Sequence, residues 1–409
     1  MVEAVYCNDE KDLNLNISDI STFTKDFKRD IDNFEIYFIG VNPRNSVEFY
    51  WVDVKFSDNM SNVRFFIKKY ISETHYDISG KYKKRESKLQ CEVDTYSFFN
   101  SFVSEKDKFK VPWFKFNLDK KILFMEYIPF ILDGLATLFD GELHKLKFDL
   151  FSDSVEALAV FHNIGFENRQ GLIYSPYRLN SFDRDDYSDR IVNYLRGVVV
   201  RNLGLGNEDG KKYNFSSCVE SLIREYSSKL ILNFTRFSDH IIHWDLFPGH
   251  VGFTDKGVVF FDYDHVGFGP CQYDLCSLLK NPFANFSDEE LTELYNIYLS
   301  NRHDIFVSEK DKLKFYKGVF YCDVYNSIRS MGVGCWHEIV NPDSYHRSID
   351  LFKMYDNSLY CEWHVNNLEN LIKKAGYFGL DRRDISDIDE LVGVANDLFY
   401  KTGVFDILK

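Results

Sequence analysis

A short segment in the second half of the chain constrains the fold and the chemistry more than any other part. It reads His243-Trp-Asp-Leu-Phe-Pro-Gly-His250, then Val251 to Phe261, then Asp262. Thr254-Asp-Lys-Gly257 has the composition of a tight turn between two apolar runs, so the pattern predicts a β-hairpin. Such a hairpin would fold Asp262 back beside Asp245. Two neighbouring carboxylates can hold a metal ion and orient a reacting group.

Composition indicates a folded globular protein. The chain has 409 residues, of which 45% are hydrophobic and 17% aromatic, so it can bury a sizeable core. Its length suits two or three domains, or the two lobes of one enzyme. The longest apolar runs, Lys121 to Phe130 and Val258 to Phe261, are too short to span a bilayer. The N-terminus lacks the basic and apolar regions of a secretory signal. We therefore expect a cytoplasmic protein without a membrane partner.

The cysteines and the charge narrow the range of partners. The eight cysteines are scattered without a Cys-x-x-Cys pair, so neither a zinc ribbon nor a thioredoxin-type site is supported. The net charge is −14, and residues 1–125 hold as many basic as acidic side chains, so the negative excess lies in the remainder. Such a surface repels nucleic acid and favours a cationic or neutral substrate. No nucleic-acid partner is expected, and the oligomeric state is left open.

Hydrophobic patterns divide the chain into a sheet-forming part and a helical part. Short runs rich in β-branched and aromatic residues predict strands, and the turn-forming stretches between the first three predict an antiparallel meander. The expected strands are at residues 35–39, 46–56, 62–70, 113–117 and 121–127. Apolar residues at helical spacing from Leu89 to Phe99 predict a helix after the meander. Helical patterns dominate beyond residue 130.

These patterns predict an α+β fold with two lobes, a small antiparallel-sheet lobe and a large, mainly helical lobe. The N-terminal lobe is expected at residues 1–126, with 1–34 as a polar arm or helix. The C-terminal lobe is expected at residues 127–409. It includes a candidate catalytic loop at 243–250 and a helical extension at 281–409, in which no motif with readable chemistry is found.

The ordered motifs resemble those of aminoglycoside phosphotransferases, choline kinases and their relatives, which have a protein-kinase-like bilobal fold. In that family, His-Gly-Asp-(x)4-Asn precedes a β-hairpin that ends in Ile-Asp-Phe. The segment His243 to His250 and the later Phe261-Asp-Tyr-Asp264 are similar to these two motifs. Gly267-Phe-Gly-Pro-(x)3-Asp-Leu275 also falls in family order. Because a lone His-x-Asp is common, the order of the motifs carries the resemblance.

Matches upstream extend the resemblance over roughly residues 35–280. Phe65-Phe-Ile-Lys68 resembles the strand with the phosphate-contacting lysine, and Glu92 resembles the helix glutamate that pairs with this lysine. Glu126 and Ile128 resemble hinge residues whose backbone hydrogen-bonds adenine. In the loop from Gly40 to Ser46 the resemblance implies that Asn45 and Ser46 meet the phosphates, although this loop has a single glycine.

The resemblance implies an ATP-dependent phosphotransferase with an alcohol group as acceptor. GTP is the alternative phosphate donor. Asp245 would orient and help deprotonate the acceptor, and Asp262 would bind Mg²⁺ or Mn²⁺. Lys68 would contact the α- and β-phosphates while Glu92 holds it in place. The implied acceptor is a small molecule that is aminoglycoside-, choline- or sugar-like, and its identity is open.

Two departures from the family pattern bear on catalysis. His250 stands where the family has a metal-binding Asn, and an imidazole nitrogen suits magnesium less well than oxygen does. Three outcomes stay open: His250 ligates a borderline metal such as manganese, water and Asp264 complete the shell without it, or the site no longer catalyses. Trp244 replaces the usual Gly, so the family's substrates do not transfer to this chain.

Two other functions remain as alternatives. One is a kinase for Ser or Thr hydroxyls of a peptide or protein in a biosynthetic pathway. The other is a pseudokinase that binds nucleotide or a partner without turnover, which His250 motivates. Structural roles are expected for three other polar residues. His243 should hold loop backbone, His162 should pack in a helix, and Asp274 should cap the helix that begins at Leu275. The charged run at 81–88 is expected to be solvated.

Overall fold

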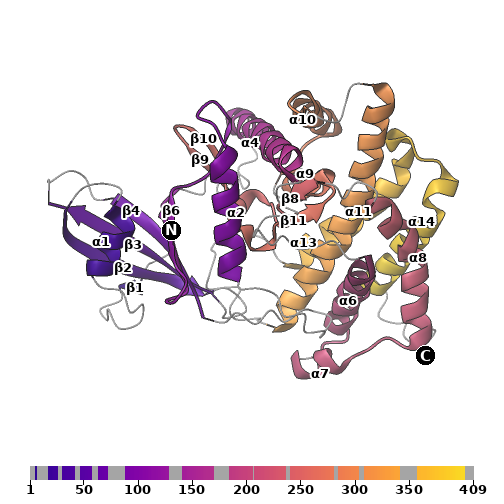
Figure 1. Cartoon of the computed structure of the whole chain (residues 1–409). Coiled ribbons are helices and arrows are strands. Elements are labelled where there is room, and N and C mark those ends of the chain that lie inside the picture. The colour runs from indigo at the N-terminus through magenta and orange to yellow at the C-terminus, as the bar shows by residue number, and fades with distance from the viewer. Residues whose placement is uncertain are drawn as a thin grey trace.

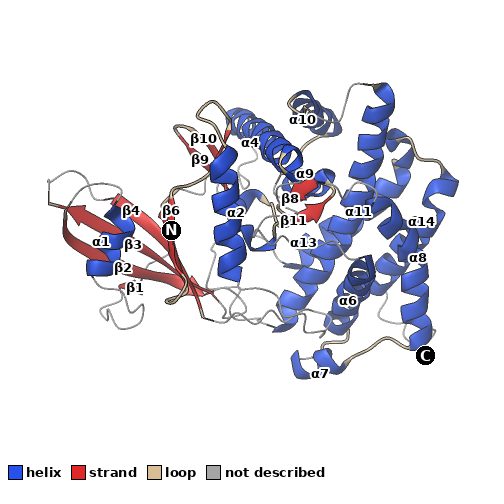
Figure 2. Cartoon of the chain, viewed as in Figure 1, coloured by secondary structure: helices blue, strands red, loops and turns tan. Residues whose placement is uncertain are grey.

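The computed structural model describes residues 5–6, 17–25, 30–41, 47–57, 63–71, 88–128, 141–169, 184–205, 207–235, 240–280, 284–303, 308–340 and 357–400. Figure 1 shows a sheet at one end of the molecule and a larger group of helices at the other, with α2 (Lys88–Phe102) between them. Figure 2 shows that helices dominate the second part. The predicted α+β fold is confirmed. The predicted boundary between residues 126 and 127 stays a prediction.

The N-terminal sheet has six strands, and every pair of neighbours is antiparallel. Its order is β1 (Val5–Tyr6), β2 (Ile31–Val41), β3 (Val47–Phe56), β4 (Val63–Tyr70), β7 (Ile122–Glu126) and β6 (Phe114–Asn117). The meander predicted from the β-branched and aromatic runs is therefore present as β2, β3 and β4. The two later strands join β4 through β7.

The sheet is covered on one face by α1 (Ile17–Thr24), which lies within the segment expected to be a polar arm or helix. Strand residues on this face, such as Val52, Phe65 and Phe124, are fully buried. Phe23 of α1 stacks on Phe124 with ring centroids 5.0 Å apart. This burial of alternate strand residues explains why the hydrophobic runs form a two-faced sheet.

The helix α2 connects the sheet to the helical lobe. Its residues Leu89, Val93, Tyr96 and Phe99 are buried, as the helical spacing predicts. Phe99 stacks on Phe161 at a centroid distance of 4.3 Å. One hydrophobic core continues from α2 into the helices, so α2 has a fixed position between the two parts of the molecule.

The helical lobe consists of helices packed around that core. They are α4 (Gly141–Glu167), α6 (Arg184–Asn202), α7 (Asn207–Lys212), α8 (Ser217–Thr235), α9 (Cys271–Leu279), α10 (Asp288–Ser300), α11 (Glu309–Val340), α13 (Asn357–Lys373) and α14 (Arg382–Tyr400). The long helix α11 packs against α6, α9 and α13. It thereby carries part of the C-terminal extension into the centre of the lobe (Figure 1).

Two small sheets position the candidate catalytic segment. β8 (His240–Ile242) pairs with β11 (Gly267–Gly269), and the predicted hairpin is formed by β9 (Val251–Thr254) and β10 (Gly257–Phe260). β10 also pairs with β5 (Phe109–Lys110). Gly257 has φ +146°, and a Cβ there would lie 2.3 Å from the carbonyl oxygen of Lys108. The turn between β9 and β10 therefore requires glycine.

Some predictions fall outside the described residues, namely the loop with Asn45 and Ser46 and most of the charged run at 81–88. None of the helices in the described ranges has the length and apolar character needed to cross a membrane.

Candidate functional site

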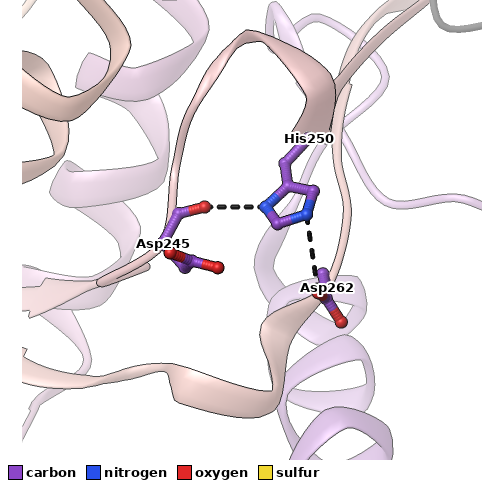
Figure 3. A group of neighbouring side chains, drawn as sticks. All are labelled: Asp245, His250 and Asp262. Atoms are coloured by element: carbon purple, nitrogen blue, oxygen red, sulfur yellow. Dashed lines mark hydrogen bonds and ion pairs between the residues drawn. The ribbon is translucent and has the colours of Figure 1, made fainter. Parts of the chain in front are cut away.

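Asp245, His250 and Asp262 meet at the two ends of the hairpin (Figure 3). Asp245 follows β8, His250 ends the 3₁₀ turn η2 (Pro248–His250), and Asp262 follows β10. One potential ligand atom from each residue lies within 4.8 Å of the others. The hairpin therefore brings the two predicted carboxylates together, with the imidazole between them.

The orientation of His250 favours a cation beside it. Its Nδ1 lies 2.7 Å from the carbonyl oxygen of Asp245, so this nitrogen carries the proton and donates. Its Nε2 lies 3.5 Å from Oδ2 of Asp262. In a neutral ring, the Nε2 lone pair would face a carboxylate, which is unfavourable unless a proton or a metal ion lies between them. The imidazole nitrogen of His250 beside a carboxylate oxygen of Asp262 suits a borderline divalent ion such as manganese better than magnesium.

The backbone around this group is strained and held by a buried carboxylate. Trp244 and Asp262 have φ of 67° and 65°, a region that non-glycine residues adopt rarely. Asp274 accepts hydrogen bonds from the backbone N–H groups of His243 (2.6 Å) and Trp244 (2.9 Å). The prediction that Asp274 caps α9 is wrong, because the N-cap of this helix is Pro270. The carboxylate of Asp274 holds the loop at His243 and Trp244 instead.

Two buried histidines complete this support. His162 Nε2 lies 3.1 Å from Asp274 and its Nδ1 lies 2.7 Å from the hydroxyl of Tyr298. His243 Nε2 lies 2.7 Å from the carbonyl oxygen of Phe261, a backbone contact of the kind expected for it. Burial raises the pKa of Asp274 to about 6, although His243 and the two N–H donors oppose this shift.

Lys68 links the sheet to the candidate metal group. Its Nζ lies 2.9 and 3.1 Å from the two carboxylate oxygens of Glu92 on α2, and 2.6 Å from Oδ1 of Asp262. The hydroxyl of Tyr70 also donates to Glu92. Burial works against the charge of Lys68, but Asp262 and Glu92 hold its pKa above the ordinary value. Burial likewise opposes the charge of Asp262, but Lys68 and His250 hold its pKa well below the ordinary range.

A second lysine enters the site from α2. Lys88 Nζ lies 2.5 Å from Oδ2 of Asp264, and the Lys88 side chain is 11% exposed. The interpretation of the run at 81–88 as a solvated face is therefore wrong for Lys88. Lys88 precedes Glu92 by four residues, so both lie on one face of the helix. That spacing was the signal that could have identified it.

Asp245 has a partner that the sequence analysis missed. Arg329 on α11 donates from Nη2 to Oδ1 of Asp245 at 2.6 Å. Burial would raise the pKa of Asp245, but Arg329 and then His250 hold it well below the ordinary range. The two residues are 84 positions apart, and no motif around Arg329 indicates the contact.

The hinge residues lie at the end of β7. The N–H of Glu126 donates to the carbonyl oxygen of Trp113 at 3.0 Å, and its side chain accepts from the N–H of Trp113 at 3.1 Å. Adenine contact at Glu126 would therefore have to use its carbonyl oxygen. Ile128 is 5% exposed. Asn45 and Ser46 lie outside the described residues.

Comparisons with known proteins agree with this arrangement. Residues 218–316 match the family described as the APH phosphotransferase enzyme family. This segment contains the loop with Asp245, the hairpin and Asp262. No curated protein sequence matches the chain.

Solved structures show the fold. An ethanolamine kinase from Plasmodium vivax is 14% identical, with a TM-score of 0.51, and the match covers 89% of both chains. A choline kinase from Cryptosporidium parvum Iowa II is 12% identical, with a TM-score of 0.49, covering 84% of this chain and 91% of the other. ADP-bound aminoglycoside phosphotransferase APH(2″)-Ib is 14% identical, with a TM-score of 0.43, covering 92% and 96%.

The predicted resemblance to this family is confirmed by the matched segment and the shared protein-kinase-like fold. The family match supports a phosphotransferase that acts on a hydroxyl group. The roles of the individual site residues are a separate matter and stay predictions.

Proposed function

We propose that the chain is an ATP-dependent phosphotransferase that phosphorylates a hydroxyl group of a small molecule. One observation carries the proposal: Lys68 contacts both Glu92 and Asp262, while Asp262 lies beside His250 and Asp245. A lysine of the sheet and two carboxylates of the helical part thus converge. This is the arrangement that phosphoryl transfer requires.

Each residue has a distinct task in this proposal. Lys68, held by Glu92, would contact the α- and β-phosphates of ATP. Asp262 and His250 would hold a divalent ion, Mg²⁺ or Mn²⁺, which when bound neutralises phosphate charge. Asp245 would accept a hydrogen bond from the acceptor hydroxyl. The carbonyl oxygen of Glu126 and the backbone of Ile128 would contact adenine, and Asn45 and Ser46 the phosphates.

The chemical step follows from these positions. The acceptor oxygen attacks the γ-phosphorus in line with the bond to the bridging oxygen of ADP, which breaks as the new P–O bond forms. The hydroxyl proton passes to the carboxylate of Asp245, and ADP leaves. The low pKa of Asp245 keeps its carboxylate ionised at neutral pH, so it can accept a hydrogen bond from the hydroxyl and orient it before the P–O bond forms. Because such a carboxylate is a weak base, it takes the proton only as the new P–O bond forms and the hydroxyl becomes acidic.

The net charge of −14 on its own favours a cationic or neutral acceptor. A peptide or protein hydroxyl would use the same chemistry. GTP could replace ATP without a change in these roles. The cytoplasmic location stays a prediction.

A nucleotide-binding pseudokinase is the second candidate, and one feature favours it. His250 occupies the position of the metal-binding Asn, while Lys68 and Lys88 already pair with Asp262 and Asp264. Metal binding would have to compete with these ion pairs. The site would then hold nucleotide without turning it over.

Two measurements on the wild type separate the candidates. Thermal unfolding with ATP, and with ATP plus Mg²⁺ or Mn²⁺, reports nucleotide binding. Release of ADP over time in the presence of mixed alcohols reports turnover. If the chain is an enzyme, nucleotide should raise its Tm, and ADP should be released in a metal-dependent way. A higher Tm with no ADP release with either metal would favour the pseudokinase, and no change in Tm would contradict both candidates.

A further inference from the structure

Arg329 places a cation at the side chain that would bind the acceptor hydroxyl. Its Nη2 lies 2.6 Å from Oδ1 of Asp245, and the side chains of Arg329 and Asp245 are 27% and 23% exposed. A guanidinium has five N–H donors in a planar fork. Over the described ranges, the guanidinium donates a hydrogen bond to this one carboxylate oxygen. The partly exposed fork therefore retains donor capacity that can face a bound molecule.

The surroundings of Arg329 place it on the helical side of Asp245. Its electrostatic neighbours are Tyr273 of α9 and Tyr194 of α6, besides Asp245. By contrast, Lys68 of β4 and Lys88 of α2 pair with Asp262 and Asp264. The N-terminal lobe thus supplies the cations on the nucleotide side. α11 supplies a cation on the side where an acceptor would lie.

The local charge differs from the charge of the whole chain. The carboxylates of Asp245, Asp262 and Asp264 each have a cationic partner within 2.6 Å. The negative excess of the chain therefore does not extend into the site as unpaired charge. A cationic group beside the reacting hydroxyl would meet the guanidinium of Arg329 at short range, where repulsion is strong. An anionic group would be attracted there.

We propose that the acceptor alcohol carries an anionic group, a carboxylate or a phosphate, which Arg329 binds while Asp245 orients the hydroxyl. Arginine suits this role because its planar fork matches both anions. Arg329 would then determine specificity, since it touches both the acceptor and the residue that takes the acceptor proton. This inference rests on the proposed function and differs from the cationic acceptor that net charge alone favours.

The test is a binding titration that does not need the natural acceptor. Wild type, Arg329→Gln and Arg329→Lys are saturated with Mg²⁺ and ADP and titrated by calorimetry with glycerate, glycerol 3-phosphate, glycerol and choline. Arg64→Gln is the matched control, because Arg64 pairs with Asp53 on the N-terminal sheet through two hydrogen bonds. The two anionic probes distinguish a carboxylate from a phosphate.

We expect wild type to bind at least one anionic probe more tightly than glycerol, and choline most weakly. Arg329→Gln should weaken anion binding by about tenfold or more, since a charged hydrogen bond is lost. Arg329→Lys should recover part of the affinity, and Arg64→Gln should match wild type. Choline binding tighter than the anions, or anion affinity equal in wild type and Arg329→Gln, would overturn the inference.

A second titration addresses the phosphoryl group itself. If anions bind to the ADP complex but are excluded when a non-hydrolysable ATP analogue fills the γ-phosphate position, Arg329 serves the transferred group and the inference about the acceptor fails. Persistence of Arg329-dependent binding in that complex supports it. Nucleotide affinity is measured in the same samples. Failure of nucleotide to bind would count against the proposed function, while titration of the nucleotide-free protein would still test Arg329.

Discussion

The ion pairs Lys68–Glu92 and Arg329–Asp245 differ in their burial and in the elements that they join. Lys68 and Glu92 have side chains that are 8% and 0% exposed, whereas Arg329 and Asp245 are 27% and 23% exposed. The first pair joins a strand and a helix that are close in sequence. The second joins the loop to α11, far along the chain.

The difference in burial predicts different roles for the two pairs. A buried pair fixes lobe geometry, because separating its two charges inside the protein leaves each of them desolvated and unpaired, which costs several kcal/mol. A partly exposed pair, whose charges keep some contact with water, can exchange partners with a bound molecule at smaller cost. We therefore assign nucleotide handling to the Lys68 pair and acceptor choice to the Arg329 pair.

The largest effect should come from the nucleotide side. Asp262→Asn removes the carboxylate that Lys68 contacts and that would hold the metal. We expect phosphoryl transfer to fall by about 10³-fold or more, since metal charge stabilisation amounts to several kcal/mol. The rate of ADP formation at saturating metal measures this. Turnover within a few-fold of wild type would break the assignment of Asp262.

The two pairs should also differ in stability. Glu92→Gln removes one charge of the buried pair, and we expect the free energy of unfolding to fall by about 3 kcal/mol. Arg329→Gln removes one charge of the partly exposed pair, and the expected loss is about 1 kcal/mol. Denaturant unfolding of both variants measures the contrast. Equal losses would remove the distinction between the two pairs.

Activity of Arg329→Gln should depend on pH in a way that wild type does not. In wild type, Arg329 holds the pKa of Asp245 low, so the carboxylate is ionised down to acidic pH. Without the guanidinium, burial raises this pKa, and activity should be lost as pH falls through the new value. We expect the acid limb of the variant's profile to lie about one pH unit above that of wild type, which corresponds to roughly 1 kcal/mol. The pH profile of kcat/KM measures it, with Arg64→Gln as the control. Parallel profiles would contradict the electrostatic role of Arg329.

The smallest effect should be on metal choice. His250→Asn replaces a ring nitrogen with a neutral oxygen donor, so the preference should shift toward Mg²⁺. We expect the ratio of Mg²⁺- to Mn²⁺-supported rates to rise by roughly tenfold or less, in keeping with one ligand change. Parallel rate titrations with each ion measure this ratio. An unchanged ratio would remove His250 from the metal shell.

The sequence predicted the sheet, α2 and the hairpin well because these elements are tied to local patterns. Alternation on strands identified the sheet, helical spacing identified α2, and the turn at 254–257 identified the hairpin. The contact between Arg329 and Asp245 was not predictable in the same way. Arg329 reaches Asp245 only because α11 packs against α6 and α9, and tertiary packing of a helix leaves no short-range signature.

Asp274 and Lys88 are intermediate cases. Asp274 was assigned to a helix cap, but burial left its carboxylate facing the N–H groups of His243 and Trp244. Lys88 lies at the end of a charged run that composition suggests is solvated, yet the helix turns it toward Asp264. In both cases the sequence indicates the residue type, but tertiary packing determines which way the side chain points.

Asp245→Asn tests the central claim most directly. The substitution keeps the shape of the side chain but removes its ability to take a proton from the acceptor hydroxyl. We predict that ATP-dependent phosphorylation of an alcohol falls by about 10²- to 10⁴-fold, while the affinity for ATP with Mn²⁺ or Mg²⁺ stays within about threefold of wild type, a ratio worth less than 1 kcal/mol. Undiminished transfer by Asp245→Asn would contradict the account.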